Sequence, residues 1–462
     1  MEDSLPASPK TATSPGPLAA LPPTPLAWRV AIALAIVLLT AGAYALRDVL
    51  GPRGVAAVGA VSFIGMAALF SANLRAVSWR TIGWGLALQL LLALFVLRFE
   101  VFGYHPGRAL FEALGNVIRE FLAFTNKGSE FVFGVLANPD AMKDTVGKPV
   151  FIFAFRALPT IIFVSSFFTV LYYLGVLQFV VRVMARLMMY LMGTSGAESL
   201  SAAANVFMGQ TEAPLIVKPY VPRMTQSELL ALMVGGMATV SGGIMGVYVE
   251  LGGRPEAILA TSVMAAPCGL YLAKLLLPET EEPETRGRAK VAVEQPHSNL
   301  IDAAASGASD GLYLALNVAA VLIAFLAFIA LANNVLGYWF PGLSLEAIFA
   351  RVFWPAAFLM GVEGDDIPRV ADLLGTKLVA NELAAYGALK AKYLGVLSER
   401  SLTLTTYALT GFANIASIGI QLGGIGGMAP ARRKDLARLG TRALLAGFLA
   451  TLINASLAGM LM

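Results

Sequence analysis

The sequence predicts an all-α polytopic membrane protein. Hydrophobic residues make up 57% of the 462 residues and charged residues only 13%, and the mean hydropathy is +0.73. These values lie outside the range of soluble domains. An uncharged stretch of about 17 residues or more can cross the hydrocarbon core of a bilayer. Nine such stretches occur, at 30–46, 54–74, 81–97, 157–181, 229–249, 257–273, 311–345, 401–431 and 443–462. We therefore expect a multi-pass protein of the plasma membrane, which in a bacterium is the inner membrane.

Charge and cysteine content exclude several other classes. The net charge is only +4 and the basic residues are scattered, which does not indicate a nucleic-acid partner. The single cysteine, Cys268, excludes an intrachain disulfide framework. His105 and His297 lie beside prolines and lack neighbouring metal ligands, so no resident metal or enzymatic cofactor is indicated.

The first half of the chain divides into four segments. Residues 1–26 are rich in Pro, Ser, Thr and Ala and are expected to form a disordered tail. Residues 27–53 hold an extra N-terminal transmembrane helix, and 54–186 hold transmembrane and interfacial helices of a scaffold side. Apolar residues recur at helical spacing over 111–121, with charges between them, which is typical of a helix lying in the membrane interface. Residues 187–277 contain a first hairpin and the spans that follow it.

The second half repeats this organisation after a charged linker, 278–299. A long scaffold helix is expected over 300–342, and a second hairpin with its following spans over 343–462. The apolar runs of 187–220 and 343–390 are interrupted by Gly and Pro. Short apolar runs of this kind are typical of re-entrant segments, whose irregular backbone must be covered by protein or water.

Each hairpin is followed by a span that small and polar residues interrupt. The interruptions are Gly235-Gly-Met-Ala-Thr-Val-Ser-Gly-Gly-Ile244 and Gly411-Phe-Ala-Asn-Ile-Ala-Ser-Ile-Gly419. Matching interruptions in two halves indicate an internal repeat whose broken helix ends meet near the membrane midplane. The predicted fold is therefore an inverted-repeat transporter with two re-entrant helical hairpins and broken transmembrane helices.

Two carboxylates, Glu212 and Glu382, lie inside these apolar regions. An ionisable group at bilayer depth costs at least about 2.5–3.5 kcal/mol, so it normally faces a cavity and marks an ion or substrate path. We expect the two acids to line one cavity. The alternative for Glu212 is a structural ion pair with Lys218 or Arg223.

The neighbours of these acids suit a neutral, hydroxyl-rich solute. Gln210 and Thr211 add amide and hydroxyl groups beside Glu212, and a carboxylate accepts charge-assisted bonds from sugar hydroxyls. Interhelical hydrogen bonding is the structural alternative for each residue alone. In the second half, an aromatic face and two hydrogen-bonding groups suit a planar ring that carries a ribose, at Phe412, Asn414 and Ser417.

An oxygen-rich set beside the first hairpin can hold one sodium ion. A hard cation prefers oxygen ligands, and an unwound helix frees backbone carbonyls to supply them. The candidates are the side chains of Asn205 and Thr239 and the carbonyls of Met208, Thr239 and Val240. The structural alternative for Thr239 and Ser241 is close helix packing.

These residues lie in motifs that resemble the concentrative nucleoside transporter family. The matching segments are Ser201-Ala-Ala-Ala-Asn205, Gly209-Gln-Thr-Glu-Ala-Pro-Leu215, Asn381-Glu-Leu-Ala-Ala-Tyr386, Ala408-Leu-Thr-Gly-Phe-Ala-Asn-Ile-Ala-Ser-Ile-Gly419 and Gly307-Ala-Ser-Asp-Gly311 with Leu314-Ala-Leu-Asn-Val318. The resemblance covers roughly residues 54–462.

The resemblance implies a homotrimer in the bilayer that couples nucleoside uptake to sodium by an elevator-like movement. By similarity the base side would be met by Gln210, Thr211, Glu212 and Ile244, and the ribose by Glu382, Asn414 and Ser417, with Phe412 packed on the base. Asn205, Thr239 and the carbonyls of Met208, Thr239 and Val240 would bind sodium.

The chain departs from the family pattern at three places. The span at 30–46 is extra, Gly361-Val-Glu-Gly-Asp-Asp366 replaces the usual Gly-Val-Pro-Trp, and Thr239 replaces a serine. Proton coupling through Glu212 or Glu382 is the main alternative to sodium. A membrane-embedded enzyme acting on lipid-linked sugars and a passive channel are further alternatives, and the sequence does not distinguish purine from pyrimidine substrates.

Overall fold

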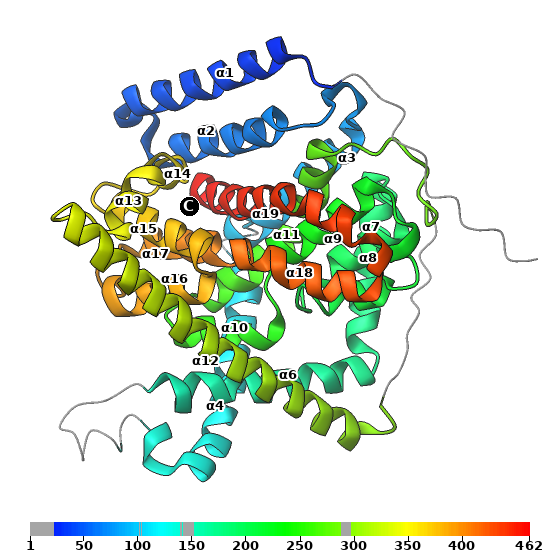
Figure 1. Ribbon diagram of the computed structural model, residues 1–462, viewed down its shortest axis with the longest axis vertical. Coiled ribbons are helices and arrows are strands. Elements are labelled where there is room, and N and C mark those ends of the chain that lie inside the picture. The colour runs from blue at the N-terminus through cyan, green and yellow to red at the C-terminus, as the bar shows by residue number, and fades with distance from the viewer. Residues whose placement is uncertain (1–22, 101, 103, 139–140, 142–151, 288–296) are drawn as a thin grey trace, which may run out of the picture.

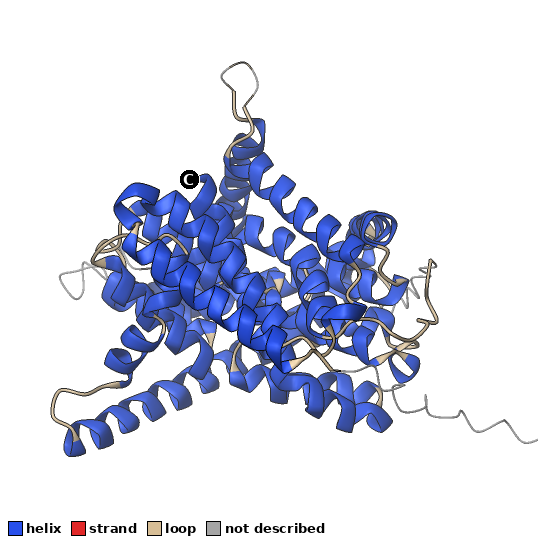
Figure 2. Ribbon diagram, turned by 90° about the horizontal axis from the view of Figure 1, so that it is seen from above, coloured by secondary structure: helices blue, strands red, loops and turns tan. Residues whose placement is uncertain are grey.

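The protein is helical throughout the part of the chain that the computed structural model describes, residues 23–462 apart from 101, 103, 139–140, 142–151 and 288–296 (Figures 1 and 2). Almost all of the expected tail, 1–26, and part of the linker, 278–299, lie outside the described residues. Within them, eight segments are long and apolar enough to span a membrane: Leu26–Ala45 (α1), Arg47–Leu69 (α2), Trp79–Leu97 (α3), Phe153–Tyr173 (α6), Gln226–Glu250 (α9 and α10), Pro255–Leu276 (α11), Leu300–Trp339 (α12) and Pro430–Leu461 (chiefly α19).

Three of the nine predicted stretches are divided between two helices, and one of them, 229–249, is divided between α9 and α10 at the predicted interruption. The 401–431 stretch forms two short helices, α17 (Glu399–Leu409) and α18 (Ile415–Met428). The 157–181 stretch does not continue as one helix, because Gly175 takes a left-handed conformation (φ 80°) between α6 and α7 (Val176–Met192). Glycine adopts this conformation without steric cost, so the chain turns although its composition stays apolar.

The predicted interfacial helix is part of α4 (Pro106–Phe133), which lies at the lower edge of Figure 1.

Several short elements connect the helices. They are α13 (Leu345–Val352), α14 (Trp354–Leu359) and the 3₁₀ turns Leu74–Ala76, Gly134–Ala137 and Pro430–Arg432.

Helices α6 and α12 pack side by side along much of their length (Figure 1). Glycines allow the close approach, because a Cβ at Gly307 would lie 2.5 Å from Thr169 Oγ1 and one at Gly311 only 2.7 Å from Ile162 Cα. The 40-residue α12 is otherwise largely exposed. This pair therefore borders the rest of the molecule rather than joining its core.

The core is built from α9 (Gln226–Ala238), α11 and α19 (Arg433–Leu461), with α3 against them. Almost every residue of α9 is buried, as expected for a helix that is apolar all round. Gly447 lets α19 approach α9, since a Cβ there would lie 2.6 Å from Met237 Cβ.

The first hairpin region begins with α8 (Gly196–Ala204) and continues through 3₁₀ turns at Ala213–Val217 and Val221–Arg223 into α9. Both α8 and α9 start with a capping box, in which a Ser or Thr side chain and a Glu side chain satisfy free backbone N–H groups. Lys274 of α11 neutralises one of these buried acids, with its Nζ 2.8 Å from Glu198 Oε2. The two helix starts are thus fixed to the core.

The second hairpin region consists of α15 (Asp366–Val379), α16 (Glu382–Ala388) and a π-helical turn at Leu389–Tyr393. The departure from the family pattern at 361–366 forms the turn that leads from α14 into α15. Gly361 and Gly364 have positive φ values of 79° and 49° there. Two glycines therefore make the turn, which explains how the chain manages without the Pro-Trp pair.

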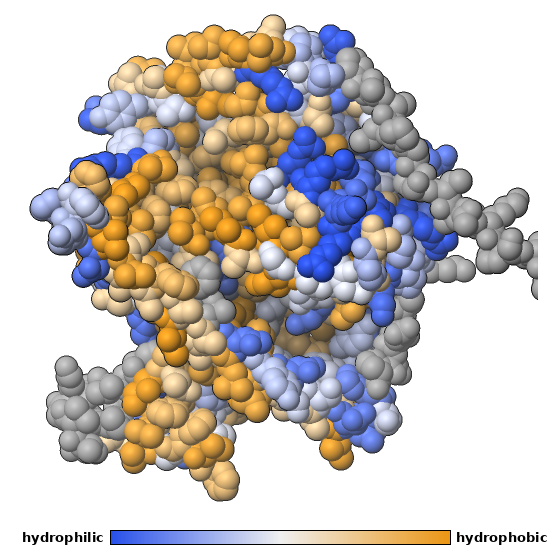
Figure 3. All heavy atoms as spheres, in the orientation of Figure 1, coloured by the Kyte–Doolittle hydropathy of each residue, from blue (hydrophilic) through white to orange (hydrophobic). Residues whose placement is uncertain are grey.

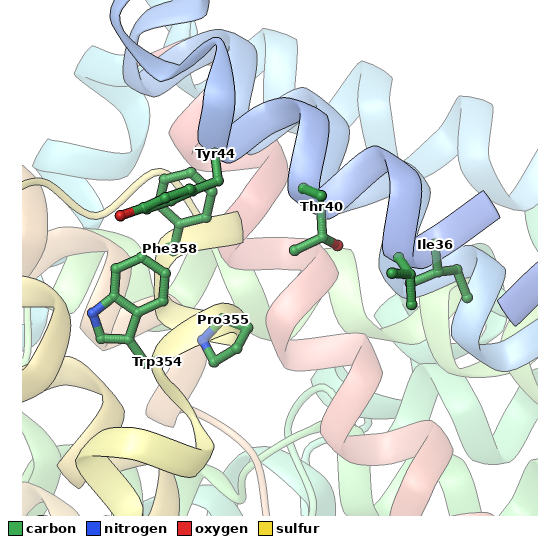
Figure 4. Close-up of a pocket in the computed structure, with 8 residues that line it drawn as sticks. Ile36, Thr40, Tyr44, Trp354, Pro355 and Phe358 are labelled. Carbon is green, nitrogen blue, oxygen red and sulfur yellow. The ribbon is translucent and has the colours of Figure 1, made fainter. Parts of the chain in front are cut away.

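The extra N-terminal helix α1 packs on α2 at the edge of the molecule (Figure 1). Only Ala43 of α1 is buried, and the face in Figure 3 is strongly apolar over this helix. A shallow apolar groove of about 630 Å³ separates α1 from α14, with Tyr44 facing Trp354 and Phe358 (Figure 4). An exposed apolar surface of this kind is suited to contact with lipid.

Candidate functional site

Two helix breaks meet in the core. One separates α9 from α10 (Gly242–Glu250) at Thr239–Ser241, and the other separates α17 from α18 at Thr410–Asn414. The backbone N–H of Phe412 donates to the carbonyl of Thr239 at 3.1 Å. Both breaks were predicted from their small and polar residues, and this bond joins them directly.

The predicted residues of the second half form one hydrogen-bonded group. Glu382 is the first residue of α16 and is only 3% exposed. One of its carboxylate oxygens accepts from Asn414 Nδ2 at 2.9 Å and the other from the Tyr248 hydroxyl at 3.1 Å. Asn414 also caps α18 by accepting from the Ser417 N–H at 2.9 Å. The break thus fixes the side chains that were predicted to meet a ribose.

The first hairpin loop reaches this group through Gln210. Its Nε2 lies 3.3 Å from Ser417 Oγ, although the two residues are 207 positions apart. Thr211 packs against α18 at Gly424, where a Cβ would lie 2.7 Å from Thr211 Cγ2. Phe412 lies in the second break and is partly buried, and Ile244 lies in α10 next to the first break and is 3% exposed. The structure therefore brings residues from both halves together.

Glu212 opens instead into a cavity of about 750 Å³ between the first hairpin and the α6–α12 pair. Its carboxylate accepts from the Gly209 N–H at 3.0 Å. Arg223, a predicted structural partner, pairs with Glu284 at 3.0 Å. The cavity is also lined by Met208, Ser241, Lys218, Ser165, Phe168 and Asp310.

Glu382 does not line this cavity, so the expectation that both acids face one space is not met in this conformation. Glu382 instead accepts hydrogen bonds from Tyr248 of α10 and from Asn414 at the second helix break.

The residues predicted to hold sodium show one feature that fits a cation. Asn205 is completely buried, and its Oδ1 has no hydrogen-bond partner among the described residues. Its Nδ2 donates to Ser201 O at 2.9 Å, which leaves the oxygen pointing elsewhere. Thr239 Oγ1 donates to Gly235 O at 2.9 Å, and a hydroxyl that donates still has two lone pairs with which to accept. A Cβ at Gly235 would lie 2.9 Å from Asn205 Nδ2, so both side chains border this glycine.

Sequence reasoning missed three residues around the site. Tyr248 binds Glu382, and Lys377, which is fully buried, donates to Ala408 O at 2.7 Å and Thr451 Oγ1 at 3.0 Å. Gln421 lies one helical turn beyond Ser417. Helical spacing alone would have placed Gln421 on the face of Ser417.

A helical membrane protein whose two broken helices meet beside a buried acid, Glu382, has the architecture of a secondary transporter. Three family models match the chain: the N-terminus of Na+ dependent nucleoside transporters at 58–136, nucleoside recognition at 154–255, and the C-terminus of Na+ dependent nucleoside transporters at 257–459.

Individual relatives agree with these family models. The chain is 45% identical over 407 residues to sodium/nucleoside cotransporter 1 of Mus musculus, covering 84% of this chain but 60% of the relative. It is 45% identical over 416 residues to an uncharacterized transporter of Haemophilus influenzae, covering 87% of this chain and 96% of the relative. The chain thus spans about 60% of the length of the mouse relative and nearly all of the bacterial one.

Solved structures of CNTnw have the same fold. An inward-facing, substrate-bound structure matches with a TM-score of 0.83 at 41% identity, covering 88% of this chain and 97% of that one. A double variant in an outward-facing state matches with a TM-score of 0.84 at 40% identity, covering 89% and 98%. The chain belongs to the sodium-dependent nucleoside transporter family.

Proposed function

We propose that this protein is a sodium-coupled nucleoside importer that works by secondary active symport. The observation that carries the proposal is the hydrogen-bonded group of Glu382, Asn414, Ser417 and Gln210, assembled from both halves beside the two helix breaks. Its acceptors and donors suit a sugar at one end and a base at the other.

The ribose end is centred on Glu382. A carboxylate has about four acceptor positions, and Tyr248 and Asn414 use two of them. Two positions therefore remain for ribose hydroxyls. We assign the base end to Gln210, Thr211, Glu212 and Ile244, with Phe412 packed on the base.

The sodium ion is assigned to Asn205, Thr239 and the carbonyls of Met208, Thr239 and Val240. The unpartnered Asn205 oxygen supports this assignment, because a buried acceptor without a partner costs about 1–3 kcal/mol. A bound cation removes that cost. Since Asn205 and Gln210 lie on one short segment, the ion orders the loop that meets the nucleoside, and each ligand raises the affinity for the other.

The proposed transport movement is based on the separation of the hairpin regions from the α6–α12 pair. The cavity lined by Glu212 lies between the first hairpin and the α6–α12 pair, so this pair acts as the fixed scaffold and the hairpins, which re-enter the membrane, move against it. The exposed length of α12 supports a homotrimer in the plasma membrane, with α12 at the subunit contacts. Native mass spectrometry of the purified protein tests this assembly, and a monomer would contradict it.

Uptake into proteoliposomes tests the proposed function. Radiolabelled uridine and adenosine are supplied with an inward sodium gradient, an equal potassium gradient or a proton gradient. We expect accumulation above the external concentration with sodium alone. Accumulation driven by protons alone would select the proton-coupled alternative, equilibration without accumulation would indicate a channel, and a chemically altered nucleoside in the time course would indicate an enzyme.

A further inference from the structure

Gln421 has no role in the function proposed above, yet it borders the base end of the site. It lies in α18, and positions 417, 421 and 424 share one face of that helix because they are spaced by four and three residues. Ser417 touches Gln210, and Gly424 receives Thr211. Gln421 lies between these two contacts.

Gln421 and Gln210 meet at a single glycine of α9. A Cβ at Gly236 would lie 2.8 Å from Gln210 Cβ and 2.8 Å from Gln421 Nε2. The absence of a side chain at Gly236 is what allows both glutamines to approach α9 so closely. The two side chains are therefore neighbours although they come from opposite halves of the chain.

The amide of Gln421 is held in one orientation. Its Nε2 donates to the carbonyl of Met233 at 2.9 Å, and the side chain is completely buried. Its Oε1 consequently points away from Met233, and it has no hydrogen-bond partner among the described residues. Gln210 is in the same situation, since its Nε2 is held at Ser417 while its buried Oε1 has no partner.

The two neighbouring glutamines each carry a buried acceptor without a partner among the described residues, and such a pair can receive a group that brings two N–H bonds. An amino group does this, whereas a carbonyl oxygen at the same place would face two oxygens and leave both unpaired. A site built to hydrogen-bond a substrate group rejects the analogue that lacks it far more strongly than an apolar pocket rejects a size difference.

We propose that Gln421, together with Gln210, selects nucleosides whose base carries an exocyclic amino group. This inference rests on the proposed nucleoside transport and specifies its substrate class. Cytidine carries an amino group on the base where uridine carries a carbonyl. Adenosine and inosine differ in the same way among the purines. The protein prefers cytidine to uridine and adenosine to inosine.

Initial sodium-driven uptake of the four radiolabelled nucleosides into proteoliposomes tests the proposal. For the unaltered protein we expect both ratios, cytidine to uridine and adenosine to inosine, to be about tenfold or more, as for one well-placed pair of base-edge hydrogen bonds. In Gln421→Met, which keeps the length of the side chain without the amide, both ratios fall at least about fivefold. Gln421→Leu provides a second variant if the first does not fold.

Gln89→Met is the matched control. Gln89 is also a completely buried glutamine, bonded to Asn454 of α19 at 2.6 Å and to Tyr271 of α11 at 2.8 Å, so neither partner belongs to a helix break. We expect it to lower the yield of folded protein while leaving both ratios unchanged.

Each other outcome has a defined meaning. Ratios near one in the unaltered protein overturn the inference but leave nucleoside transport intact. An equal loss for all four nucleosides in Gln421→Met also overturns it, because the amide then only orders the hairpin loop or a buried water. The absence of sodium-driven uptake of all four by the unaltered protein overturns the proposed function itself.

Discussion

Replacing Glu382 by glutamine is expected to weaken nucleoside binding about 30-fold. The carboxylate is 3% exposed, and Tyr248 and Asn414 each donate to one of its oxygens. Ribose hydroxyls therefore add to these bonds rather than replace them. A hydrogen bond to a charged acceptor contributes about 1 kcal/mol more than one to a neutral acceptor. Weakening two ribose hydrogen bonds therefore costs about 2 kcal/mol of binding free energy in total, and each 1.4 kcal/mol corresponds to about a factor of ten in the dissociation constant.

The measurement is equilibrium binding of adenosine to the purified transporter in saturating sodium, compared with 2′,3′-dideoxyadenosine. The dideoxy compound lacks both hydroxyls, so Glu382→Gln should not weaken its binding further. Glu363→Gln is a matched control, because Glu363 lies on the approach to the same hairpin but its side chain is 51% exposed. Unchanged adenosine affinity in a folded Glu382→Gln variant would refute the ribose assignment.

Three further substitutions test other parts of the structure. Asn205→Leu removes one proposed ion ligand and should raise the sodium concentration for half-maximal uptake at least about tenfold. A sodium titration of uptake measures this, and an unchanged titration would exclude Asn205 from the ion site. Lys377→Met leaves two buried neutral acceptors without this donor, at a cost of about 1–3 kcal/mol for each. It should therefore lower the thermal unfolding temperature, and a higher temperature would contradict the expectation. Gly59→Ala places a Cβ 1.8 Å from Leu359 O and should lower the same temperature by separating α2 from α14, while Gly83→Ala, with nothing within 4 Å, should not.

The breaks in the two halves were predictable from sequence because their cause is local. Small and polar residues interrupt long apolar runs at 239–241 and 410–414, and the helices end there. The turn at Gly175 was not predictable from sequence, because the residues on both sides of it are as apolar as those of a continuous membrane span. The uncharged stretch at 311–345 does not by itself give the start of α12 at Leu300, which is where the long scaffold helix was expected to begin; the polar first residues of α12 pack against α6.

The candidate site was predictable in its residue types but not in its connections. Glu382 and Asn414 were recognisable as polar groups in apolar sequence. Their hydrogen bond, and the contact of Gln210 with Ser417, join segments that no local pattern relates. Tyr248 was missed because a single polar residue within an apolar helix has no distinct periodicity, and its significance depends on the partner that the fold supplies. Gln421 shares a helix face with Ser417, but its contact with Gln210 depends on the fold.

The backbone hydrogen bond from Phe412 to Thr239 has a consequence for how such a transporter evolves. A carbonyl has two lone pairs, so Thr239 O can keep this bond while it also faces a cation. In the proposed ion assignment, the ion and the nucleoside are coupled through a peptide plane that side-chain replacement leaves in place, except for replacement of Phe412 by proline, which lacks the N–H. Side-chain substitutions around the site would therefore change which nucleoside is transported before they uncouple sodium movement from nucleoside transport.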